Sequence, residues 1–444
     1  MAMKVYFISL GCPKNLVDSE LMLGSLTEHN YEIINSPDLA DVIVINTCSF
    51  INDAKQESIE AILEMVDYKK PGVGNCKKLV VTGCLPQRYI QELAAELPEV
   101  DLFLGTSGQE SLVDFLKQES RVQVNEEPEF EYSEKTWRLL TTPSHMAWLK
   151  IGEGCDRHCT FCIIPKLRGQ YKSRKVSLVL EEAKRLVDQN VKEIILVAQD
   201  LSVYGSDLDE KNTLFHLLQG LEKIEKIIWI RLMYFYPDEL KDDLIRKLKN
   251  SPKICKYLDL PVQHFSNNIL KRMNRNITGE IILEKINQIK TLIPDITLRT
   301  SIIVGFPGET PEDFQILLEG IKKAKFHHLG VFPYSDEEGT AAFKMSDKIA
   351  ESVIQKRLKK VYMIQKKITE DLNRTYVGKN IKVVIEGVHS ETDLLIIGRH
   401  EGQAPDIDGK VIINDLNGKK ANVGDFVDVK ISDVLEYDLI GSVI

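Results

Sequence analysis

Short apolar runs that alternate with helical patterns constrain the fold of this 444-residue chain more than any other feature. Four runs in the first 135 residues have the length and the Val, Ile and Leu content of buried strands. They are Lys4–Ser9, Val42–Asn46, Lys78–Thr82 and Asp101–Leu104, and helical patterns follow at Asn15–Glu28, Asp53–Tyr68, Pro86–Leu97 and Gln109–Lys117. This alternation favours a parallel sheet covered by helices. We therefore expect an α/β domain with a doubly wound parallel sheet over residues 1–135.

A second series of the same kind begins near Met146. Its candidate strands are His145–Ile151, Glu193–Val197, Ile227–Leu232, Tyr257–Leu260, Thr297–Val304 and Leu329–Pro333. The helical stretches between and after them include Leu178–Gln189, Glu239–Leu248, Glu280–Ile293 and Pro311–Lys323. Six such units are too few for an eight-fold barrel, so a partial (β/α)6 barrel is expected over residues 136–375. We interpret the polar segment 126–135 as the linker and 351–374 as a closing amphipathic helix.

The last part of the chain changes to short β patterns punctuated by glycine. The patterns are Ile381–Glu386, Leu394–Gly398, Lys410–Ile413 and Phe426–Ser432. They predict a small antiparallel β-barrel over residues 376–444. The whole chain is thus expected to be an α/β multidomain protein with a β-barrel at its end.

Eight cysteines in a chain of this length do not form a disulfide scaffold, and no apolar stretch reaches the roughly 18 residues that span a bilayer. The first ten residues read as a strand and not as a secretory signal. We expect a cytoplasmic protein with no membrane partner. Clustered thiols in that compartment are more often metal ligands than disulfides.

Three cysteines within ten residues give the strongest functional signal. Cys155, Cys159 and Cys162 form a CxxxCxxC pattern. It supplies one thiolate fewer than a closed four-coordinate zinc site requires. Three thiolates can hold a [4Fe–4S] cluster and leave one iron open to a ligand that is not protein. The alternatives are a zinc loop or unrelated buried thiols.

A second set of three cysteines is scattered in the sequence, yet each of its members follows a predicted strand. Cys12, Cys48 and Cys84 come two or three residues after the first three apolar runs. Because the carboxyl ends of parallel strands meet at one edge of a sheet, these thiols are expected to converge there. Gly11 and Gly83 would let the backbone turn sharply beside a bulky cluster. Three buried structural cysteines are the alternative, and we interpret Cys76 and Cys255 in that way.

The charges are divided unevenly along the chain. Residues 1–135 hold 11 basic against 23 acidic residues, and residues 376–444 hold 7 against 12. The middle of the chain has a net charge of +8. Acidic ends are poorly suited to bind a phosphate backbone and favour a basic macromolecule as the partner.

Taken together, these features resemble the radical S-adenosylmethionine (SAM) methylthiotransferases. The resemblance covers essentially the whole chain, and residues 376–444 resemble a TRAM domain. The run Leu10–Glu20 is similar to the branch that modifies a ribosomal protein. Residues 404–409 and 436–441 also look like that branch.

The resemblance implies two [4Fe–4S] clusters, SAM, and insertion of a methylthio group at the β-carbon of an aspartate. The substrate it implies is a small-subunit ribosomal protein near the decoding centre, free or within the assembled subunit. The CxxxCxxC cluster would bind and cleave SAM, and the second cluster would handle the sulfur. An electron donor is also implied, and a monomer is expected.

Five further residues are candidates for binding SAM. Phe161 occupies the aromatic position of the family motif, and Gln199 ends a predicted barrel strand, where binding groups gather. Arg174, like Arg168, follows the cysteine loop and could neutralise the cluster or the SAM carboxylate. Gly305 and Gly308 resemble the glycine-containing strand that backs the adenine. A core aromatic, solvated arginines and an ordinary turn are the respective alternatives.

Two other functions remain open at this point. The first is methylthiolation of a tRNA adenosine by the same type of enzyme, which a basic TRAM face would favour. The second is a non-catalytic iron–sulfur carrier, whose cluster would not respond to SAM.

Overall fold

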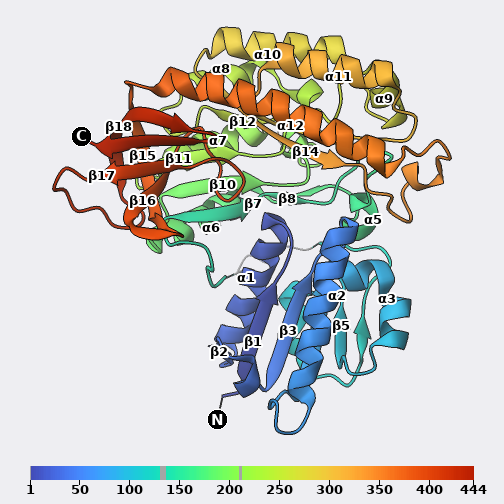
Figure 1. The fold of residues 1–444 in the computed structure, drawn as a ribbon. Coiled ribbons are helices and arrows are strands. Elements are labelled where there is room, and N and C mark those ends of the chain that lie inside the picture. Colours follow the sequence, from blue (N-terminus) through green and yellow to red (C-terminus); the bar gives the residue numbers. More distant parts are fainter. Residues whose placement is uncertain (1, 131–136, 210–212) are drawn as a thin grey trace.

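The computed structural model describes residues 2–130, 137–209 and 213–444, which form three consecutive units (Figure 1). The linker expected at 126–135 and the expected boundary at 135/136 fall partly in 131–136, outside the described residues.

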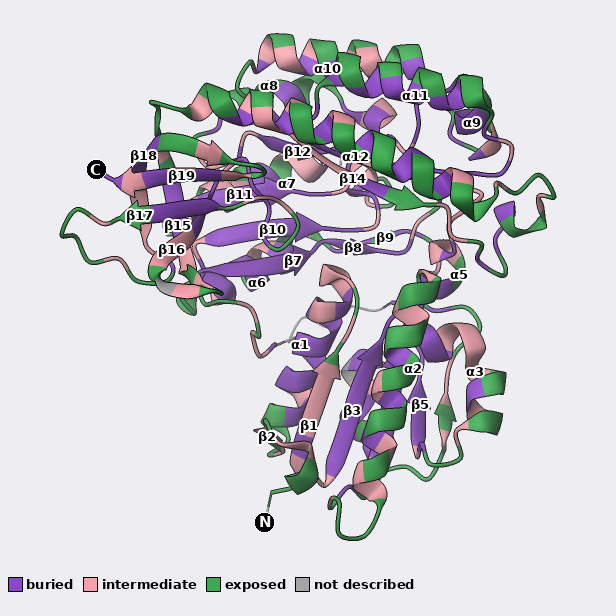
Figure 2. Cartoon of the chain, viewed as in Figure 1, coloured by how far each residue is buried: buried purple, intermediate pink, exposed green. Residues whose placement is uncertain are grey.

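The first unit is a six-stranded parallel sheet in the order β2-β1-β3-β4-β5-β6. The central strand β3 (Val42–Thr47) is buried along its whole length, as the β-branched run over residues 42–45 predicts (Figure 2). Two strands of three and two residues, β2 and β6, carry too little pattern to be expected from the sequence. The other elements are β1 (Lys4–Ser9), α1 (Pro13–Glu28), β2 (Glu32–Ile34), α2 (Asn52–Val66), β4 (Lys78–Gly83), α3 (Cys84–Glu96), β5 (Leu102–Leu104), α4 (Leu112–Leu116) and β6 (Val122–Gln123).

The second unit is the expected partial barrel. Its six main strands lie in the order β7-β10-β11 and β12-β13-β14, all parallel, and a parallel bridge between Ile230 and Ile254 joins the two halves. The strands are β7 (Met146–Lys150), β10 (Glu193–Val197), β11 (Trp229–Leu232), β12 (Tyr257–Asp259), β13 (Thr297–Val304) and β14 (His328–Pro333), with the short pair β8 (Gly152–Glu153) and β9 (Lys172–Ser173). The helices are α5 (Ile164–Arg168), α6 (Val176–Asp188), α7 (Thr213–Glu222), α8 (Asp242–Asn250), α9 (Asn267–Arg272), α10 (Gly279–Leu292), α11 (Pro311–Ala324) and α12 (Glu351–Asn373).

The third unit is a closed five-stranded barrel in the order β15-β16-β17-β19-β18. Its strands are β15 (Asn380–His389), β16 (Thr392–His400), β17 (Val411–Asp415), β18 (Phe426–Leu435) and β19 (Asp438–Val443). All pairs are antiparallel except β17 with β19, which run parallel. None of the described helices combines the length and apolar character needed to cross a membrane.

A buried ion-pair group joins the third unit to the second. The carboxylate of Glu193 on β10 lies 2.6 Å from Arg399 on β16 and 2.8 Å from Arg231 on β11. Burial alone would raise the pKa of Glu193, but the two guanidinium charges outweigh burial and lower the pKa to about 2. The ion-pair group therefore contributes its full stabilisation of the fold at pH values above the ordinary pKa of the carboxyl group.

Glu193→Ala is expected to destabilise the protein by about 3–5 kcal/mol, because among the described ion pairs it leaves the buried guanidinium of Arg231 without a carboxylate and that of Arg399 with Glu386 alone. Thermal denaturation would measure the loss, with the exposed pair partner Glu370→Ala as a near-neutral control. The advantage of wild type over Glu193→Ala should vanish as the pH falls from 4.5 towards 2, through the folded-state pKa. An advantage that persists undiminished at low pH would contradict this account.

Candidate active site

The second set of cysteines lies at one edge of the N-terminal sheet. Cys12, Cys48 and Cys84 follow β1, β3 and β4, and these three strands are neighbours in the sheet. Parallel pairing aligns their ends, so that Ser9 pairs with Asn46 and Asn46 with Thr82. The expected convergence of these strand ends is present.

Two glycines allow this edge to be compact. Gly11 has φ +92°, and a Cβ there would lie 2.7 Å from the Cβ of Cys48. Gly83 has φ +95°, and a Cβ there would lie 2.6 Å from the carbonyl oxygen of Thr47. Any larger residue would clash and would also be strained at these backbone angles. Both glycines thus bring the cysteine backbones together.

The CxxxCxxC loop begins where β8 ends and is held by backbone hydrogen bonds. The Cys155 N–H donates to Gly169 O at 3.1 Å, and the Cys162 N–H donates to Cys159 O at 3.0 Å. Gly154, at φ +75°, passes so close to Gln170 that a side chain would not fit. The loop therefore presents its three thiols from a fixed backbone.

Both sets of cysteines line one cavity of about 500 Å³. The carboxyl edge of the N-terminal sheet faces the end of the partial barrel near α5 and β8 (Figure 1). Two predicted SAM-binding residues, Phe161 and Gln199, line the same cavity. The fold thus joins two groups of thiols that are far apart in the sequence.

The thiols influence one another electrostatically. Burial, reinforced by neighbouring cysteines, raises the pKa of Cys48 and of Cys162 to about 12. Burial likewise raises the pKa of Cys155 to about 11. For Cys48 the neighbours are Cys84 and Cys12, whereas for Cys162 they are Cys159 and Cys155. The six thiols thus form two separate groups, which must release protons when they bind metal.

The donor set and its surroundings fit iron–sulfur clusters. Each group offers three sulfur atoms, the soft ligands that such clusters require. A cluster with three thiolates is anionic, and four cationic residues line the cavity: Lys14, Arg157, Arg168 and Arg275. Within the described ranges, no three His, Cys, Asp or Glu side chains are grouped as ligands of a single metal ion.

Gln199 and Arg275 provide polar atoms suited to the amino-acid end of SAM. The Gln199 amide donates to the carboxylate of Glu153, which leaves its Oε1 buried and without a partner among the described residues. The Nε of Arg275 is also buried and lacks a partner in the described part of the chain. An acceptor and a cationic donor that line one cavity match an ammonium and a carboxylate group.

Aromatic rings complete the site. Tyr236 lies between two guanidinium groups, with Arg157 at 3.9 Å and Arg275 at 4.1 Å from its ring centroid. Tyr234 and Gln263 line the cavity with positive φ angles of 62° and 68°. Such backbone is uncommon outside glycine and clusters at functional sites.

Three predicted SAM-binding residues do not line this cavity. Arg174 is buried beside it, where it pairs with Glu182 at 2.6 Å and donates to Lys150 O at 2.7 Å. A Cβ at Gly305 would contact Ile354, and one at Gly308 would contact Arg272. Those two glycines make room for α12 and for an arginine side chain in this structure.

Sequence reasoning missed Lys14, Tyr234, Tyr236 and Arg275. The two tyrosines come shortly after β11, so the rule that binding groups gather at strand ends could have found them. Lys14 lies near Cys12 in sequence, but nothing in the sequence indicates that it reaches the ring of Tyr234, 4.4 Å away. Cys76 and Cys255 are buried, as expected, and neither lines the cavity.

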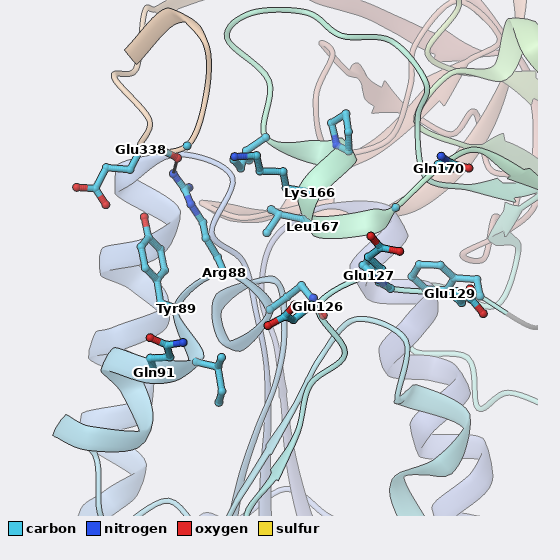
Figure 3. A pocket seen from close by; sticks show the side chains of 18 of the residues that line it. Arg88, Tyr89, Gln91, Glu126, Glu127, Glu129, Lys166, Leu167, Gln170 and Glu338 are labelled. Carbon is cyan, nitrogen blue, oxygen red and sulfur yellow. Dashed lines mark hydrogen bonds between the residues drawn. The ribbon is translucent and has the colours of Figure 1, made fainter. Parts of the chain in front are cut away.

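A larger cavity of about 1070 Å³ also borders α5, which contributes Lys166 and Leu167 to its lining (Figure 3). Residues around Arg88 on α3, the acidic segment Glu126–Glu129 and Lys166 form its walls. It has no cysteine in its lining, so size alone does not identify the reactive site.

Comparison with protein families defines the class. Residues 149–321 match the radical SAM superfamily, residues 377–444 match the TRAM domain, and residues 4–105 match an uncharacterized protein family, UPF0004. Among solved structures, the radical SAM methyltransferase TsrM from Kitasatospora setae has a TM-score of 0.57 and 13% identity, over 75% of each chain. The cobalamin-dependent radical SAM enzyme OxsB has a TM-score of 0.51 and 16% identity, over 82% of this chain and 56% of its own. These likenesses concern the fold, which is that of a radical SAM enzyme.

Comparison with individual proteins is more specific. The chain is 49% identical to the ribosomal protein uS12 methylthiotransferase RimO of Geobacter sulfurreducens, over 99% of this chain and 98% of that one. It is 47% identical to RimO of Clostridioides difficile, over 100% and 99%. The chain belongs to the RimO family of radical SAM methylthiotransferases. This finding favours the ribosomal-protein branch over the tRNA branch and an enzyme over an iron–sulfur carrier.

Proposed function

We propose that this enzyme inserts a methylthio group at the β-carbon of an aspartate in ribosomal protein uS12, using SAM and two [4Fe–4S] clusters. The convergence of two sets of three cysteines on one cavity carries the proposal. RimO relatives that match over the full length support the substrate.

The reaction explains why such a site is needed. The β-carbon bears an unactivated C–H bond with no leaving group, so acid–base side chains cannot break it. A [4Fe–4S] cluster that binds SAM at its open iron supplies, when bound, the one-electron cleavage of the sulfonium that this bond requires. Under this proposal Cys155, Cys159 and Cys162 hold that cluster.

The remaining residues position the reactants and exclude water. Gln199 Oε1 would accept a hydrogen bond from the SAM ammonium, and Arg275 would pair with its carboxylate. Phe161 offers an apolar surface for the adenine. Cys12, Cys48 and Cys84 would hold the second cluster close to the first, where sulfur is delivered. Phe50, Ile51 and Ala54 on that side of the cavity keep it apolar.

We also propose a domain organisation, an oligomeric state and a cellular location for this enzyme. Residues 1–135 form the domain of the second cluster, 136–375 the radical SAM domain and 376–444 the TRAM domain. The enzyme would act as a monomer in the cytoplasm, where uS12 is assembled into the small subunit, and would draw electrons from a separate donor.

Mass spectrometry of uS12 tests the proposed function. In cells that lack this enzyme, the mass of uS12 is expected to be lower by one methylthio group. When the enzyme is supplied again, the mass should return, and fragmentation of uS12 should place the group on an aspartate. A tRNA that loses methylthioadenosine in those cells, with uS12 unchanged, would overturn the assignment.

The acidic surface of the TRAM domain is expected to steer the basic substrate. Asp428 and Asp433 on β18 are exposed. Replacing both with Lys should raise KM for uS12 by about tenfold at low salt and leave kcat unchanged, because steering mainly alters association. Steady-state kinetics at two salt concentrations would measure this. Replacing both with Asn should give a smaller rise, and an unchanged KM in the Lys variant would contradict steering. Asp425 is left intact because its carboxylate accepts hydrogen bonds from both the backbone and the side chain of Asn422, whereas that of Asp433 accepts one from the adjacent Val434 N–H.

A further inference from the structure

Arg168 is the last residue of α5 and reaches across the boundary between the N-terminal sheet and the barrel. It is 2% exposed. Its Nη1 donates to Asp18 Oδ2 at 2.6 Å and to Glu153 Oε2 at 3.2 Å. Its Nη2 donates to Asn15 Oδ1 at 3.1 Å and lies 3.7 Å from the Sγ of Cys84, within reach of an N–H···S bond. One guanidinium group therefore contacts α1, the barrel and a cysteine of the second set.

The charges around Arg168 are balanced without Cys84. Asp18 and Glu153 each also pair with the ammonium of Lys150. Two cations thus face two carboxylates in a site closed to water, as such burial requires. The Nη2–H that points at Cys84 belongs to a group whose position these carboxylates already fix. Its orientation does not depend on the sulfur.

The same group connects the two halves of the cavity. Glu153 accepts hydrogen bonds from Arg168 and, through its other oxygen, from Gln199. Lys14 lies close enough that the charges of Cys12 and Arg168 both act on it. The contacts of Arg168 therefore run from the second set of thiols to the proposed SAM-binding amide.

We infer that Arg168 is a positioning residue for the second cluster, fixing the Cys84 thiolate and raising the reduction potential of the cluster bound there. The inference rests on the proposed two-cluster function. A hydrogen bond to a ligating sulfur withdraws negative charge from the cluster and favours the reduced state, which carries one more electron. No other described side chain outside the cysteines has a hydrogen bond to a sulfur of the second set.

Arg168→Lys separates this role from charge balance. Lysine keeps the positive charge between Asp18 and Glu153, but its three N–H donors share one nitrogen, so it lacks the planar fork with which arginine reaches both the carboxylates and Cys84. The two carboxylates will hold its ammonium, so the bond to Cys84 is lost. Arg138→Lys is the matched control. Arg138 is also buried between the sheet and the barrel, where it pairs with Glu20 and Glu182, and it contacts no cysteine of either set in the described structure.

The test uses the full chain with Cys155, Cys159 and Cys162 replaced by Ala, reconstituted so that it holds only the second cluster. A redox titration followed by electron paramagnetic resonance gives the midpoint potential. We expect Arg168→Lys to shift it to a more negative value and Arg138→Lys to leave it unchanged. An unshifted Arg168→Lys protein with a full complement of iron, or an equal shift in the control, would overturn the inference.

A second measurement needs no variant at Arg168. Arginine labelled with ¹⁵N in its guanidinium group should give a hyperfine coupling to the reduced second cluster. The absence of that coupling would also overturn the inference. The iron content of the parent protein is read first. A parent without a cluster would refute the two-cluster proposal itself, whereas a parent with iron but no coupling would refute only the role of Arg168.

Discussion

Replacing Cys159 with alanine is expected to abolish the formation of 5′-deoxyadenosine from SAM. The CxxxCxxC loop supplies three thiolates to a cluster, and two thiolates rarely keep a cluster intact. Cys159 lies between the other two in the loop and contributes to the electrostatic surroundings of both. Its loss should therefore remove the SAM-binding iron and reduce turnover to background. Chromatography of the reaction with dithionite as reductant would measure the product.

Cys255→Ala is the matched control for this experiment. Cys255 is a buried cysteine of the same barrel, packed among apolar side chains and absent from the cavity lining. Its removal costs packing but no cluster ligand, so SAM cleavage should persist. Product formation by the Cys159→Ala enzyme at a rate near wild type would refute the proposed cluster site.

Much of this site could be predicted from the sequence because its chemistry follows strand ends. Cys12, Cys48 and Cys84 each come after an apolar run that forms a strand, largely buried in β3 and β4 and half-buried in β1, and parallel pairing brings the strand ends to one edge. The sequence does not show which strands are neighbours in the sheet. The short strand β2 pairs on the outer side of β1, which leaves β1, β3 and β4 as neighbours.

The parts that sequence could not predict depend on how the domains dock. Asp18 and Arg168 are 150 positions apart, and no periodic pattern links them. Arg174 is an example of a residue whose sequence position suggests a place in the site that packing does not give it. It follows the cysteine loop as Arg168 does, yet Glu182 on α6 holds its guanidinium away from the cavity. Which of two nearby arginines reaches the thiols is decided by packing, since both carry the same charge and similar sequence context.

Gly305 and Gly308 illustrate a different difficulty. A glycine-containing turn after a strand is typical of ligand binding, but it is equally typical of close packing. In this fold the space beside Gly305 is filled by Ile354 of the closing helix α12. The sequence specifies that a side chain is absent there and does not specify what occupies the space.

Replacing Cys12, Cys48 and Cys84 together with alanine is expected to halve the iron of the reconstituted enzyme, from about eight to about four atoms per chain. The variant should still convert SAM to 5′-deoxyadenosine and should attach no methylthio group to uS12. The physical reason is that different structural elements hold the two sets of thiols, so that loss of one set leaves the backbone of the other in place. The second set lies on the strand ends of the N-terminal sheet, whereas the CxxxCxxC loop is held by Gly169 and Met273 of the barrel.

Iron analysis, SAM cleavage and mass spectrometry of uS12 on one preparation would give all three results, with Cys76→Ala as the control. Cys76 is a buried cysteine of the same sheet domain whose Sγ donates to Lys78 O at 3.3 Å, and it lies outside the cavity. That control should keep both clusters and full activity. A triple variant that retains eight irons would show that the thiols at the sheet edge are not ligands. One that has four irons and still modifies uS12 would show that a cluster there takes no part in handling sulfur. The measurements thus separate binding of the second cluster from its role in the reaction. Iron analysis reports whether the cluster is bound, and mass spectrometry of uS12 reports whether the bound cluster is needed for the product.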